Sequence, residues 1–553
     1  MSAQPIDVAL SAYAYPLLIK QLLHTPLATH PAQEIVYADK RRYSYEELSG
    51  RIHRLGQALT SLGIDPGDTV AVMDWDSHRY LECFFAVPML GAVLQTVNVR
   101  LSPEQILYTL NHAEADVVLV NSDFLGLLER IRPHLNTVRE FVLLADDNPP
   151  APADFAGEYE SLLARSRDSF DFPDFDENTR ATTFYTTGTT GLPKGVYFSH
   201  RQLVLHTLAV TGALALAPRE GGFHRDDVYM PLTPMFHVHA WGFPYIATLA
   251  GVKQVYPGRY VPEAILKLIE REKVTFSHCV PTILHMLLTA PYASQVDLSR
   301  WTVVIGGAAL TTALAEAALQ KGIDVFAGYG LSETGPVLTL AQVPPEAEAD
   351  ATHHVATRIR TGRPIPLVDL RTVGADGQTL PRNGSSSGEV VVRAPWLTQG
   401  YLKNPEASEQ LWEGGWLHTQ DVGHIDRGGD LQVTDRIKDV IKSGGEWIPS
   451  LDLEDIIGRH PAVAEAAVIG VADKEWGERP LALVVLKPEF VGKVDAADIQ
   501  AHVRVFAERG RISSFSVPDK VEFVEALART SVGKLNKRLM REQRAGKPSQ
   551  QPR

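Results

Sequence analysis

Short β-branched segments alternate with amphipathic helices in the N-terminal part of the chain, and this alternation limits the fold more than any other feature. Ser44 and Glu47 form a capping-box pattern, after which leucine and isoleucine recur at helical spacing until Gly63. Segment 79–90 predicts another helix, and the Pro- and Asp-rich stretch 146–176 predicts a connection. The predicted strands are segments 69–73, 116–120, 141–144 and 182–185. Because strands that alternate with helices build a wound, mainly parallel sheet, we expect an α/β fold.

The pattern changes near a Gly/Ser-rich turn at 383–388 and again at a hairpin turn at 427–430. Beyond these turns, the expected helices are 451–458 and 497–509, and the expected strands are 464–471, 481–486 and 521–524. This mixture has the size of a separate α+β domain. We therefore predict a large, multi-layer N-terminal domain with wound sheets at residues 1–434, a small mobile α+β C-terminal domain at 435–541, and a flexible tail at 542–553.

Composition and charge limit the partners of the chain. The 553 residues carry a formal net charge of −13, which argues against nucleic acid or anionic lipid and favours small-molecule partners. Cys83 and Cys279 suggest neither a disulfide framework nor a zinc site. No apolar stretch is long enough for a bilayer, and the N-terminus lacks the pattern of a secretion signal. These features predict a cytoplasmic protein with at most peripheral membrane contact, and they leave a homodimer open.

Residues 185–195, with the sequence YTTGTTGLPKG, form the most informative segment of the chain. Glycines let the backbone bend tightly around an anion, threonine hydroxyls donate hydrogen bonds to phosphate oxygens, and Lys194 adds positive charge. The segment follows a predicted strand and is expected to precede a helix capped by Ser199. It does not match a P-loop, because Pro193 stands before Lys194 and Gly195 stands where Ser or Thr would hold magnesium. The segment therefore predicts a phosphate cradle of another kind.

This segment resembles the signature of the adenylate-forming superfamily, which includes acyl-CoA synthetases, luciferases and the adenylation domains of peptide synthetases. Further motifs of the family follow in the expected order, from the region of Ser44 to Lys534. The resemblance implies that the protein binds ATP and Mg²⁺, with Thr186 also acting as a metal ligand. The implied nucleotide contacts in this segment are Thr186, Thr187, Gly188, Thr189, Thr190, Gly191 and Lys194.

Residues 328–335, with the sequence GYGLSETG, resemble the second nucleotide motif of the family. The resemblance implies that Tyr329 packs on adenine and that Glu333 helps to place magnesium. These roles suit an aromatic face and a hard carboxylate oxygen. The other implied residues of this region are Gly330, Ser332, Gly307 and Ala308 for the nucleotide and Gly306 for the acyl pocket.

Residues 419–421, with the sequence TQD, stand where the family usually has Thr-Gly-Asp. The resemblance implies that Asp421 accepts hydrogen bonds from the ribose hydroxyls and that Arg436 contacts ribose or phosphate. It also places Lys438 at the hinge between the two domains. Gln420 departs from the family pattern, and a residue other than glycine is expected to alter the local turn while the carboxylate is kept.

Two C-terminal segments resemble the family's loops for the two half-reactions. Segment 441–448, IKSGGEWI, resembles the loop that faces the active site during thioester formation, with Lys442 as its implied catalytic residue. The implied coenzyme A contacts are Gly444, Gly445, Glu446 and Trp447. Segment 529–534 resembles the mobile loop of the adenylation lysine, here Lys534, although Ala528 replaces a common proline and is expected to loosen the loop. The ammonium of such a lysine can bridge the attacking carboxylate and the α-phosphate and offset their repulsion.

Residues 235–241, with the sequence MFHVHAW, resemble the pocket wall of medium- to long-chain fatty acyl-CoA synthetases, in which a tryptophan gates the acyl tunnel. Trp241 is the implied gate. His237 is an implied residue of the catalytic site that orders the pocket, since a carboxylate substrate is already ionised at neutral pH and needs no base. Amino-acid-activating relatives have an aspartate at the position of His237, so an amino-acid substrate is disfavoured.

These motifs together predict an AMP-forming fatty-acid–CoA ligase whose cofactors and co-substrates are ATP, Mg²⁺ and coenzyme A. By resemblance, the C-terminal domain rotates about Lys438 between adenylation and thioester formation. The open alternatives are a ligase for an aromatic or other non-fatty acid, a luciferase-like oxidation, and a catalytically silent protein that binds acyl or nucleotide ligands. A P-loop phosphotransferase would release ADP, whereas the favoured reaction releases AMP.

Overall fold

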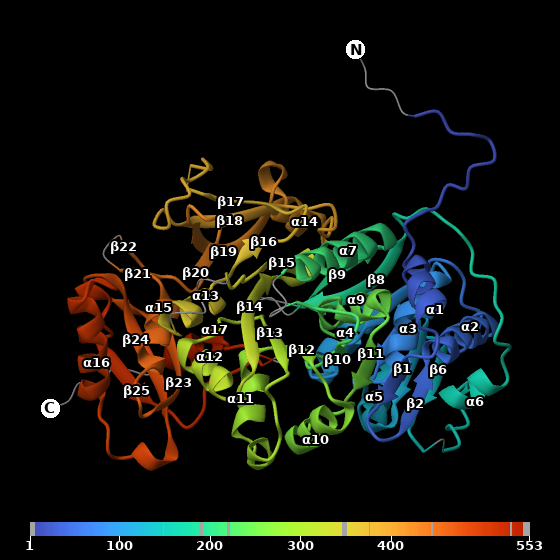
Figure 1. Cartoon of the computed structure of the whole chain (residues 1–553), viewed down its shortest axis with the longest axis horizontal. Helices are drawn as coiled ribbons and strands as arrows, with labels where there is room; N and C mark the ends of the chain where they lie inside the picture. The colour runs from blue at the N-terminus through green and yellow to red at the C-terminus, as the bar shows by residue number, and fades with distance from the viewer. Residues whose placement is uncertain are drawn as a thin grey trace.

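The computed structural model describes residues 6–147, 149–186, 192–217, 222–344, 351–374, 376–443, 446–530 and 533–545. Within these ranges the chain builds four β-sheets with helices packed against them, as Figure 1 shows. The described helices include none that is both long and apolar enough to cross a membrane.

The seven-stranded sheet contains the N-terminal strands that the sequence predicts. Its strand order is β7-β6-β5-β3-β4-β8-β9, and all neighbours are parallel except β8 and β9. The strands are β3 (Thr69–Met73), β4 (Val93–Thr96), β5 (Val117–Asn121), β6 (Glu140–Leu144), β7 (Gly157–Glu158), β8 (Arg180–Thr186) and β9 (Lys194–Ser199). The predicted wound α/β architecture is confirmed.

The nine-stranded sheet brings two of the predicted motifs to one edge. Its order is β16-β15-β14-β13-β12-β10-β11-β1-β2, with a parallel centre and antiparallel pairs at both ends. The strands are β1 (Glu34–Tyr37), β2 (Arg41–Ser44), β10 (Val228–Pro231), β11 (Lys253–Tyr256), β12 (Phe276–Cys279), β13 (Thr302–Ile305), β14 (Asp324–Gly330), β15 (Val337–Leu340) and β16 (Arg363–Pro364). Because β13 and β14 are parallel neighbours, segments 306–308 and 328–335 emerge side by side at the carboxyl edge of the sheet, where open α/β sheets bind ligands.

The helices of the larger part lie around these two sheets. They are α1 (His24–Thr29), α2 (Tyr45–Ser61), α3 (His78–Met89), α4 (Pro103–His112), α5 (Leu125–Ile131), α6 (Tyr159–Ala164), α7 (His200–Leu216), α8 (Val238–Trp241), α9 (Phe243–Ala250), α10 (Pro262–Glu272), α11 (Pro281–Thr289), α12 (Thr312–Gln320), α13 (Ala351–Arg358) and α14 (Pro405–Leu411). The predicted capping box is present at α2, since Ser44 accepts from the Glu47 backbone and the Glu47 carboxylate accepts from the Ser44 backbone.

The helix predicted after the phosphate motif is present as α7, and Ser199 caps it as predicted. Before this helix, Lys194–Ser199 forms strand β9, which was not predicted and whose Val196 and Phe198 are buried. One local prediction was wrong. The stretch 146–176 is more than a connection, since it contains β7 and α6.

Two smaller sheets complete the fold. Strands β17 (Asp369–Val373), β18 (Gly388–Arg393), β19 (Leu417–Ile425) and β20 (Leu431–Arg436) form an antiparallel sheet, and the predicted hairpin turn at 427–430 joins the last two. The C-terminal sheet contains β21 (Ile441–Ser443), β22 (Glu446–Ile448), β23 (Val463–Asp473), β24 (Gly477–Leu486) and β25 (Lys520–Phe523). Its helices are α15 (Ser450–Gly458), α16 (Ala496–Glu508) and α17 (Lys537–Ala545).

The apolar cores divide between these parts. The main cluster of buried side chains runs from Ile19 to Leu431, and the two clusters of the C-terminal sheet begin at Ile441. Figure 1 shows the C-terminal elements, in orange and red, at the opposite end of the molecule from the blue N-terminal helices. The predicted boundary at residue 435 falls inside β20, and the division into domains stays a prediction.

Candidate active site

Thr186 and Lys194 frame the predicted phosphate-binding loop. Thr186, the last residue of β8, pairs with Lys194, the first residue of β9. The Lys194 ammonium lies 4.5 Å from the centre of the Tyr401 ring, a cation–π contact. The hairpin thus holds a cation at the base of the loop. The other predicted contacts of this loop, Thr187, Gly188, Thr189, Thr190 and Gly191, lie outside the described residues.

Asp421 lies in a hydrogen-bonded group that three strands assemble. It is 4% exposed, accepts a 2.8 Å hydrogen bond from the Tyr329 hydroxyl, and lies 3.2 Å from the Arg436 guanidinium. Burial raises the pKa of Asp421, whereas the nearby Arg436 charge and the Tyr329 hydrogen bond act in the opposite direction. The structure therefore brings Tyr329, Asp421 and Arg436 together from β14, β19 and β20. A carboxylate in this position can accept hydrogen bonds from two hydroxyls of a ligand.

Gln420 occupies a backbone conformation that favours glycine. Its φ of +61° lies in the left-handed region, which explains why glycine is usual at this position of the resembled motif. The Gln420 backbone and side-chain amides both donate to Glu389, at 3.1 and 3.2 Å. These bonds anchor the turn, so the departure at Gln420 leaves Asp421 in its hydrogen-bonded position.

Glu333 lies on a short 3₁₀ turn, Ser332–Thr334, directly after β14. The Tyr401 hydroxyl donates to Glu333 Oε1 at 2.8 Å. A β-carbon placed on Gly330 would lie 1.7 Å from the Pro336 carbonyl oxygen, so glycine is required at that position. The close packing of this turn fixes the backbone position from which the Glu333 side chain extends.

The residues present fit magnesium that arrives with a nucleotide. In the described ranges, no three His, Cys, Asp or Glu side chains gather into a self-contained metal site. Mg²⁺ needs no such cage, because it usually keeps waters and binds one or two carboxylates together with substrate phosphates. Glu333, with the hydroxyl of Thr186 at the start of the phosphate loop, supplies oxygen ligands of the right kind.

Lys534 reaches this site from the C-terminal part of the chain. A β-carbon placed on Gly307 would lie 3.1 Å from Cε and 3.7 Å from Nζ of Lys534. Burial lowers the pKa of Lys534 to about 8, assisted by the Arg436 charge and opposed by Asp421 and Glu333. The ammonium therefore lies among the residues predicted for the nucleotide.

Hydrogen bonds across the two parts hold the Lys534 loop in place. Thr282 on α11 donates to the Gly533 carbonyl at 3.1 Å and accepts from Arg529 at 2.7 Å. A second contact joins α12 to α15, where the Asp455 carboxylate accepts from the Thr312 backbone at 3.0 Å. A carboxylate at a helix N-terminus is stabilised by the helix dipole. The structure is thus the arrangement in which Lys534 faces the nucleotide residues.

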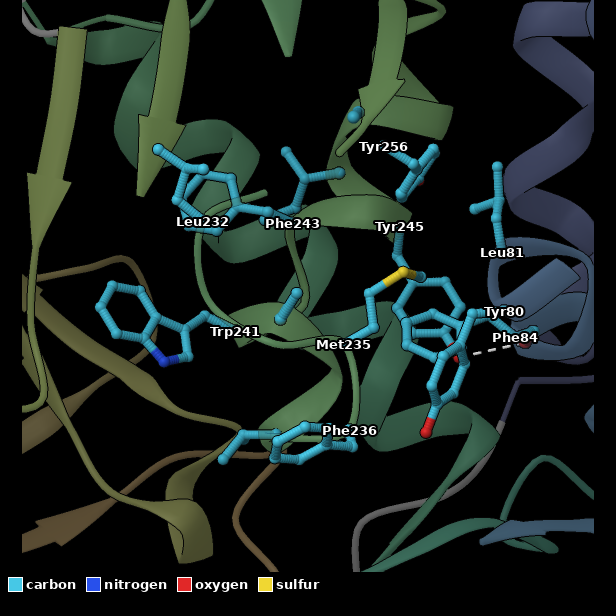
Figure 2. Packing of buried hydrophobic residues seen from close by; sticks show 14 of the residues in the cluster. Tyr80, Leu81, Phe84, Leu232, Met235, Phe236, Trp241, Phe243, Tyr245 and Tyr256 are labelled. Atoms are coloured by element: carbon cyan, nitrogen blue, oxygen red, sulfur yellow. Dashed lines mark hydrogen bonds between the residues drawn. The ribbon is translucent and has the colours of Figure 1, made fainter. Parts of the chain in front are cut away.

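Trp241 lies against Gly306 at the predicted acyl pocket. A β-carbon placed on Gly306 would lie 2.9 Å from the Trp241 ring, which also packs on His278 with ring centres 5.1 Å apart. Residues 238–241 all have φ between +47° and +58°, so this segment is a tight left-handed turn. Figure 2 shows Trp241 apart from the dense aromatic packing of Phe84 and Tyr245.

His237 lies beside this turn and is neutral at physiological pH. Burial lowers its pKa to about 3, and the charges of Lys534 and Arg100 act in the same direction. A neutral imidazole can donate one hydrogen bond and accept another. His237 is therefore placed close to Lys534, where it can orient neighbours without carrying charge.

The residues predicted for thioester formation lie outside this group. Lys442 is exposed on β21, and its backbone N–H donates to Glu478 at 2.9 Å. Lys438 is exposed between β20 and β21, and Glu446 and Trp447 lie on β22. Gly444 and Gly445 lie outside the described residues. Of the remaining predicted contacts, Ala308 is exposed beside Gly307, and Ser332 is half-buried beside Glu333.

Sequence reasoning missed Tyr401 and Thr282. Tyr401 connects the two nucleotide motifs, because its ring lies under Lys194 and its hydroxyl binds Glu333. Thr282 docks the loop of Lys534. Neither residue belongs to a segment with a recognised pattern, and only an alignment of relatives could have drawn attention to them.

The family profiles agree with this geometry. The profile of the AMP-binding enzyme family matches residues 23–402, and that of the AMP-binding enzyme C-terminal domain matches residues 452–534. The chain is 41% identical to a long-chain-fatty-acid–CoA ligase from Thermus thermophilus over 508 residues, which cover 91% of this chain and 90% of the relative. It is 39% identical to a 3-methylmercaptopropionyl-CoA ligase from Ruegeria pomeroyi, with 96% and 97% covered.

A solved structure shares the whole architecture. The anthranilate CoA ligase AuaEII, in complex with anthranoyl-AMP, superposes with a TM-score of 0.84 at 25% identity, with 96% of this chain and 98% of that chain covered. The fold, the nucleotide motifs and the similarity over nearly the full length therefore lead to one conclusion. The chain belongs to the AMP-binding enzyme family of the adenylate-forming superfamily and is an ATP-dependent, AMP-forming acyl-CoA ligase.

Proposed function

We propose that the acid activated by this ligase is a medium- to long-chain fatty acid. The observation that carries the proposal is the uncharged lining beside the adenylate position, where Trp241 lies against Gly306 and packs on His278. Burial lowers the pKa of His278 to about 3, so this side chain is neutral too. An apolar chain packs against this uncharged lining without a desolvation penalty. A charged substituent would be buried there without a partner, at a cost in binding free energy.

Two relatives support the proposal. The Thermus thermophilus relative is a long-chain-fatty-acid–CoA ligase, and a protein of Ectopseudomonas oleovorans that is 36% identical is a medium-chain-fatty-acid–CoA ligase. Other relatives act on different acids, including 3-methylmercaptopropionate and benzoate. Family membership alone therefore leaves the acid open.

In the proposed adenylation step, the nucleotide lies between the phosphate loop and the group around Asp421. Tyr329 packs on adenine, Asp421 and Arg436 hold the ribose, and Glu333 would hold the Mg²⁺ that accompanies ATP and would offset the negative charge of its phosphates. The Lys534 ammonium then faces both the substrate carboxylate and the α-phosphate, so that it offsets their repulsion as the new bond forms and pyrophosphate leaves. His237 orients this region as a neutral residue.

In the proposed second step, the C-terminal domain rotates about Lys438. The rotation withdraws Lys534 and brings the face of Lys442 and segment 444–447 toward the adenylate. The thiol of coenzyme A then attacks the acyl carbonyl, the acyl thioester forms, and AMP leaves. The proposal rests on the exposure of both Lys438 and Lys442 in the present arrangement. The proposed partners are thus small molecules.

A second candidate is a compact aromatic acid, favoured by the same tryptophan. The close approach of the Trp241 ring to Gly306 narrows the space beyond the carboxylate, so a long chain requires Trp241 to move. A flat, short acid requires less movement. The structural relative with anthranoyl-AMP binds such an acid.

One substrate panel separates the two candidates. Coenzyme-A-dependent AMP formation is measured with straight-chain acids from acetate to palmitate, with benzoate and with cinnamate. If the proposal holds, kcat/KM rises with chain length by up to about fourfold per added methylene, since each buried CH₂ contributes about 0.8 kcal/mol. A maximum at benzoate, or at acetate, would exclude a medium- or long-chain substrate. In Trp241→Ala, the preference should shift toward longer chains, whereas the matched variant Trp476→Ala, at an exposed position of the C-terminal part, should leave the preference unchanged.

A further inference from the structure

A cavity of about 470 Å³ opens beside β9, and its role is not explained by the ligase reaction. Strands β8 and β9, the first turn of α7 and the segment before α14 line it. Its main polar residues are Arg180, Tyr197, Ser199, Arg201, Tyr401 and Lys403. None of the described residues predicted to contact the nucleotide lines this cavity. Its size lies within the range of small-molecule sites.

The lining of the cavity is strongly cationic. Arg180, Arg201 and Lys403 line it, and no aspartate or glutamate does so among the described residues. The whole chain has a formal net charge of −13, so a cavity lined by three cations and by no acidic residue differs from the average charge of the chain, although glutamates outside the lining pair with Arg201 and Lys403. A concave site lined by one sign of charge concentrates ligands of the opposite sign.

Arg180 differs from the other two cations because no described carboxylate forms an ion pair with it, although the charge of Glu114, which pairs with Lys403, acts on it from a greater distance. Arg201 pairs with Glu177 at 2.7 Å, and Lys403 pairs with Glu114 at 2.8 Å. The half-buried Arg180 guanidinium makes no hydrogen bond or ion pair with any described residue, and burial lowers its pKa. A half-buried guanidinium at a cavity wall that makes no hydrogen bond within the protein keeps its N–H groups available to a ligand that enters the cavity.

A hydroxyl adds a second unused donor. The Tyr197 side chain lines the same cavity from β9, and its hydroxyl has no hydrogen-bond partner among the described residues. A guanidinium fork, two further cations and a hydroxyl match the several oxygens of a phosphate group better than the two oxygens of a carboxylate. The volume leaves room for an organic remainder beyond the phosphate.

We propose that this cavity is a binding site for a small phosphate-bearing molecule, separate from the catalytic nucleotide site, with Arg180 as its main ligand. Arg201, Lys403 and Tyr197 complete the phosphate contacts. The site adjoins the catalytic centre through Tyr401, which lines the cavity and donates a hydrogen bond to Glu333. An occupant therefore contacts the residue that positions the predicted magnesium ligand, and this makes the cavity an effector site.

The test is calorimetric titration of the full-length protein while Mg²⁺ and α,β-methylene-ATP fill the nucleotide site. Three probes distinguish free anions from phosphorylated metabolites: inorganic phosphate, pyrophosphate and ribose 5-phosphate. We expect at least one probe to bind with one site per chain. Arg180→Gln should weaken that binding about tenfold or more, as expected for the loss of charge-assisted hydrogen bonds. Tyr197→Phe, which keeps the ring, should weaken it by about threefold.

Arg167→Gln is the matched control, since Arg167 is an exposed arginine that does not line the cavity, and it should bind the probe as the unchanged protein does. Circular dichroism and adenylation without probe establish that Arg180→Gln is folded. No binding of any probe to the unchanged protein would overturn the proposal, as would equal affinities of Arg180→Gln and the unchanged protein. If Arg167→Gln weakened probe binding as much as Arg180→Gln does, the loss would reflect the net charge of the protein and not a specific site. That result would also overturn the proposal.

Discussion

At the scale of single residues, the proposed mechanism makes the division of the two half-reactions depend on Lys534. Its ammonium lies beside Gly307 and among Asp421, Glu333 and Arg436. We expect Lys534→Ala to slow adenylation roughly a hundredfold, because a lost transition-state contact of this kind costs about 3 kcal/mol. Thioester formation from supplied acyl-adenylate should keep its rate. The two half-reactions are measured separately, as pyrophosphate release and as acyl-CoA formation, and equal losses in both would contradict the assignment.

The pKa of Lys534 predicts in which direction the rate of adenylation changes with pH. Burial lowers this pKa to about 8, so the lysine is charged below that pH and loses its charge as the pH rises through it. Because kcat/KM reports the free enzyme, kcat/KM for ATP in adenylation should fall above pH about 8. In Lys534→Arg, kcat/KM should no longer fall at alkaline pH, because a guanidinium stays charged there. This expectation holds even if the variant is slower at every pH. An alkaline limb that persists in Lys534→Arg would assign the titration to another group.

Residue chemistry could be predicted where one side chain has one task. The resemblance predicts Asp421 for the ribose, Gly330 for the nucleotide and Lys534 for adenylation. These roles stay predictions, and the structure places the charges of Asp421 and Lys534 close to each other. The structure adds what those side chains touch, such as the Tyr401 hydroxyl on Glu333. Tyr401 could not be predicted because its role comes from the meeting of two distant segments, and no local pattern encodes such a meeting.

At the scale of elements, a buried ion pair joins α17 to α15. The Lys537 ammonium lies 2.6 Å from the Glu454 carboxylate and 2.6 Å from the Ser450 hydroxyl, and Lys537 and Glu454 are 7% and 9% exposed. Ser450 in turn donates to Asp435 on β20 at 2.6 Å. This chain of contacts connects the C-terminal helices to the strand that carries Arg436.

We predict that Lys537→Met destabilises α15 by about 3 kcal/mol, because it leaves the buried Glu454 charge without its counter-ion, although the Val468 N–H still donates to it at 2.8 Å. Hydrogen exchange of the α15 amides should then accelerate about a hundredfold. Burial already raises the pKa of Glu454, so the penalty should shrink as falling pH neutralises this carboxyl. The double variant Lys537→Met, Glu454→Gln should regain much of the protection of the α15 amides against hydrogen exchange. If the α15 amides of the double variant exchanged as fast as those of the single variant, the loss of stability would come from packing and not from the unpaired charge.

Whether a segment forms a helix or a strand was easier to predict than which strands pair with each other. Helical spacing of apolar residues predicted α2, and short β-branched runs predicted β3, β5, β6 and β8 of the seven-stranded sheet, whereas β4 and β7 were not predicted. Strand β9 was missed, because its six residues follow a glycine-rich motif that suggests a loop, and its strand character depends on pairing with β8. Sheet order likewise depends on contacts between distant segments, which a single sequence does not display.

At the scale of the whole molecule, the proposed mechanism requires that the arrangement of the two parts determine which half-reaction the protein can perform. The loop of Lys534 is docked by Thr282, and α15 is docked on α12 by Asp455 and by Arg459, which donates to Thr312 at 2.9 Å. These contacts are polar and few. Interfaces of this kind permit relative motion of domains, which the proposed rotation about Lys438 requires.

Fixing this arrangement should therefore separate the two activities. Thr312→Cys combined with Asp455→Cys places two thiols at a contact where the native side chains are 3.4 Å apart, within reach of a short bis-maleimide. The native Cys83 and Cys279 are buried and should be spared by the reagent. The cross-linked protein should still release pyrophosphate in one round of adenylation, because Lys534 stays beside Gly307. Acyl-CoA formation should fall to background, because the face of Lys442 cannot reach the adenylate.

Each single-cysteine variant, treated with the same reagent, controls for modification without a bridge and should retain both activities at its own untreated level. Cross-linked protein that forms acyl-CoA at the rate of these controls would mean that one arrangement serves both steps. Lys534 and Lys442 would then have to act on the same carbonyl without exchanging places, and the exposure of Lys442 in the docked state argues against that. The proposed alternation of Lys534 and Lys442 at one site therefore predicts motion of the whole C-terminal part, and a cross-link between α12 and α15 tests that motion directly.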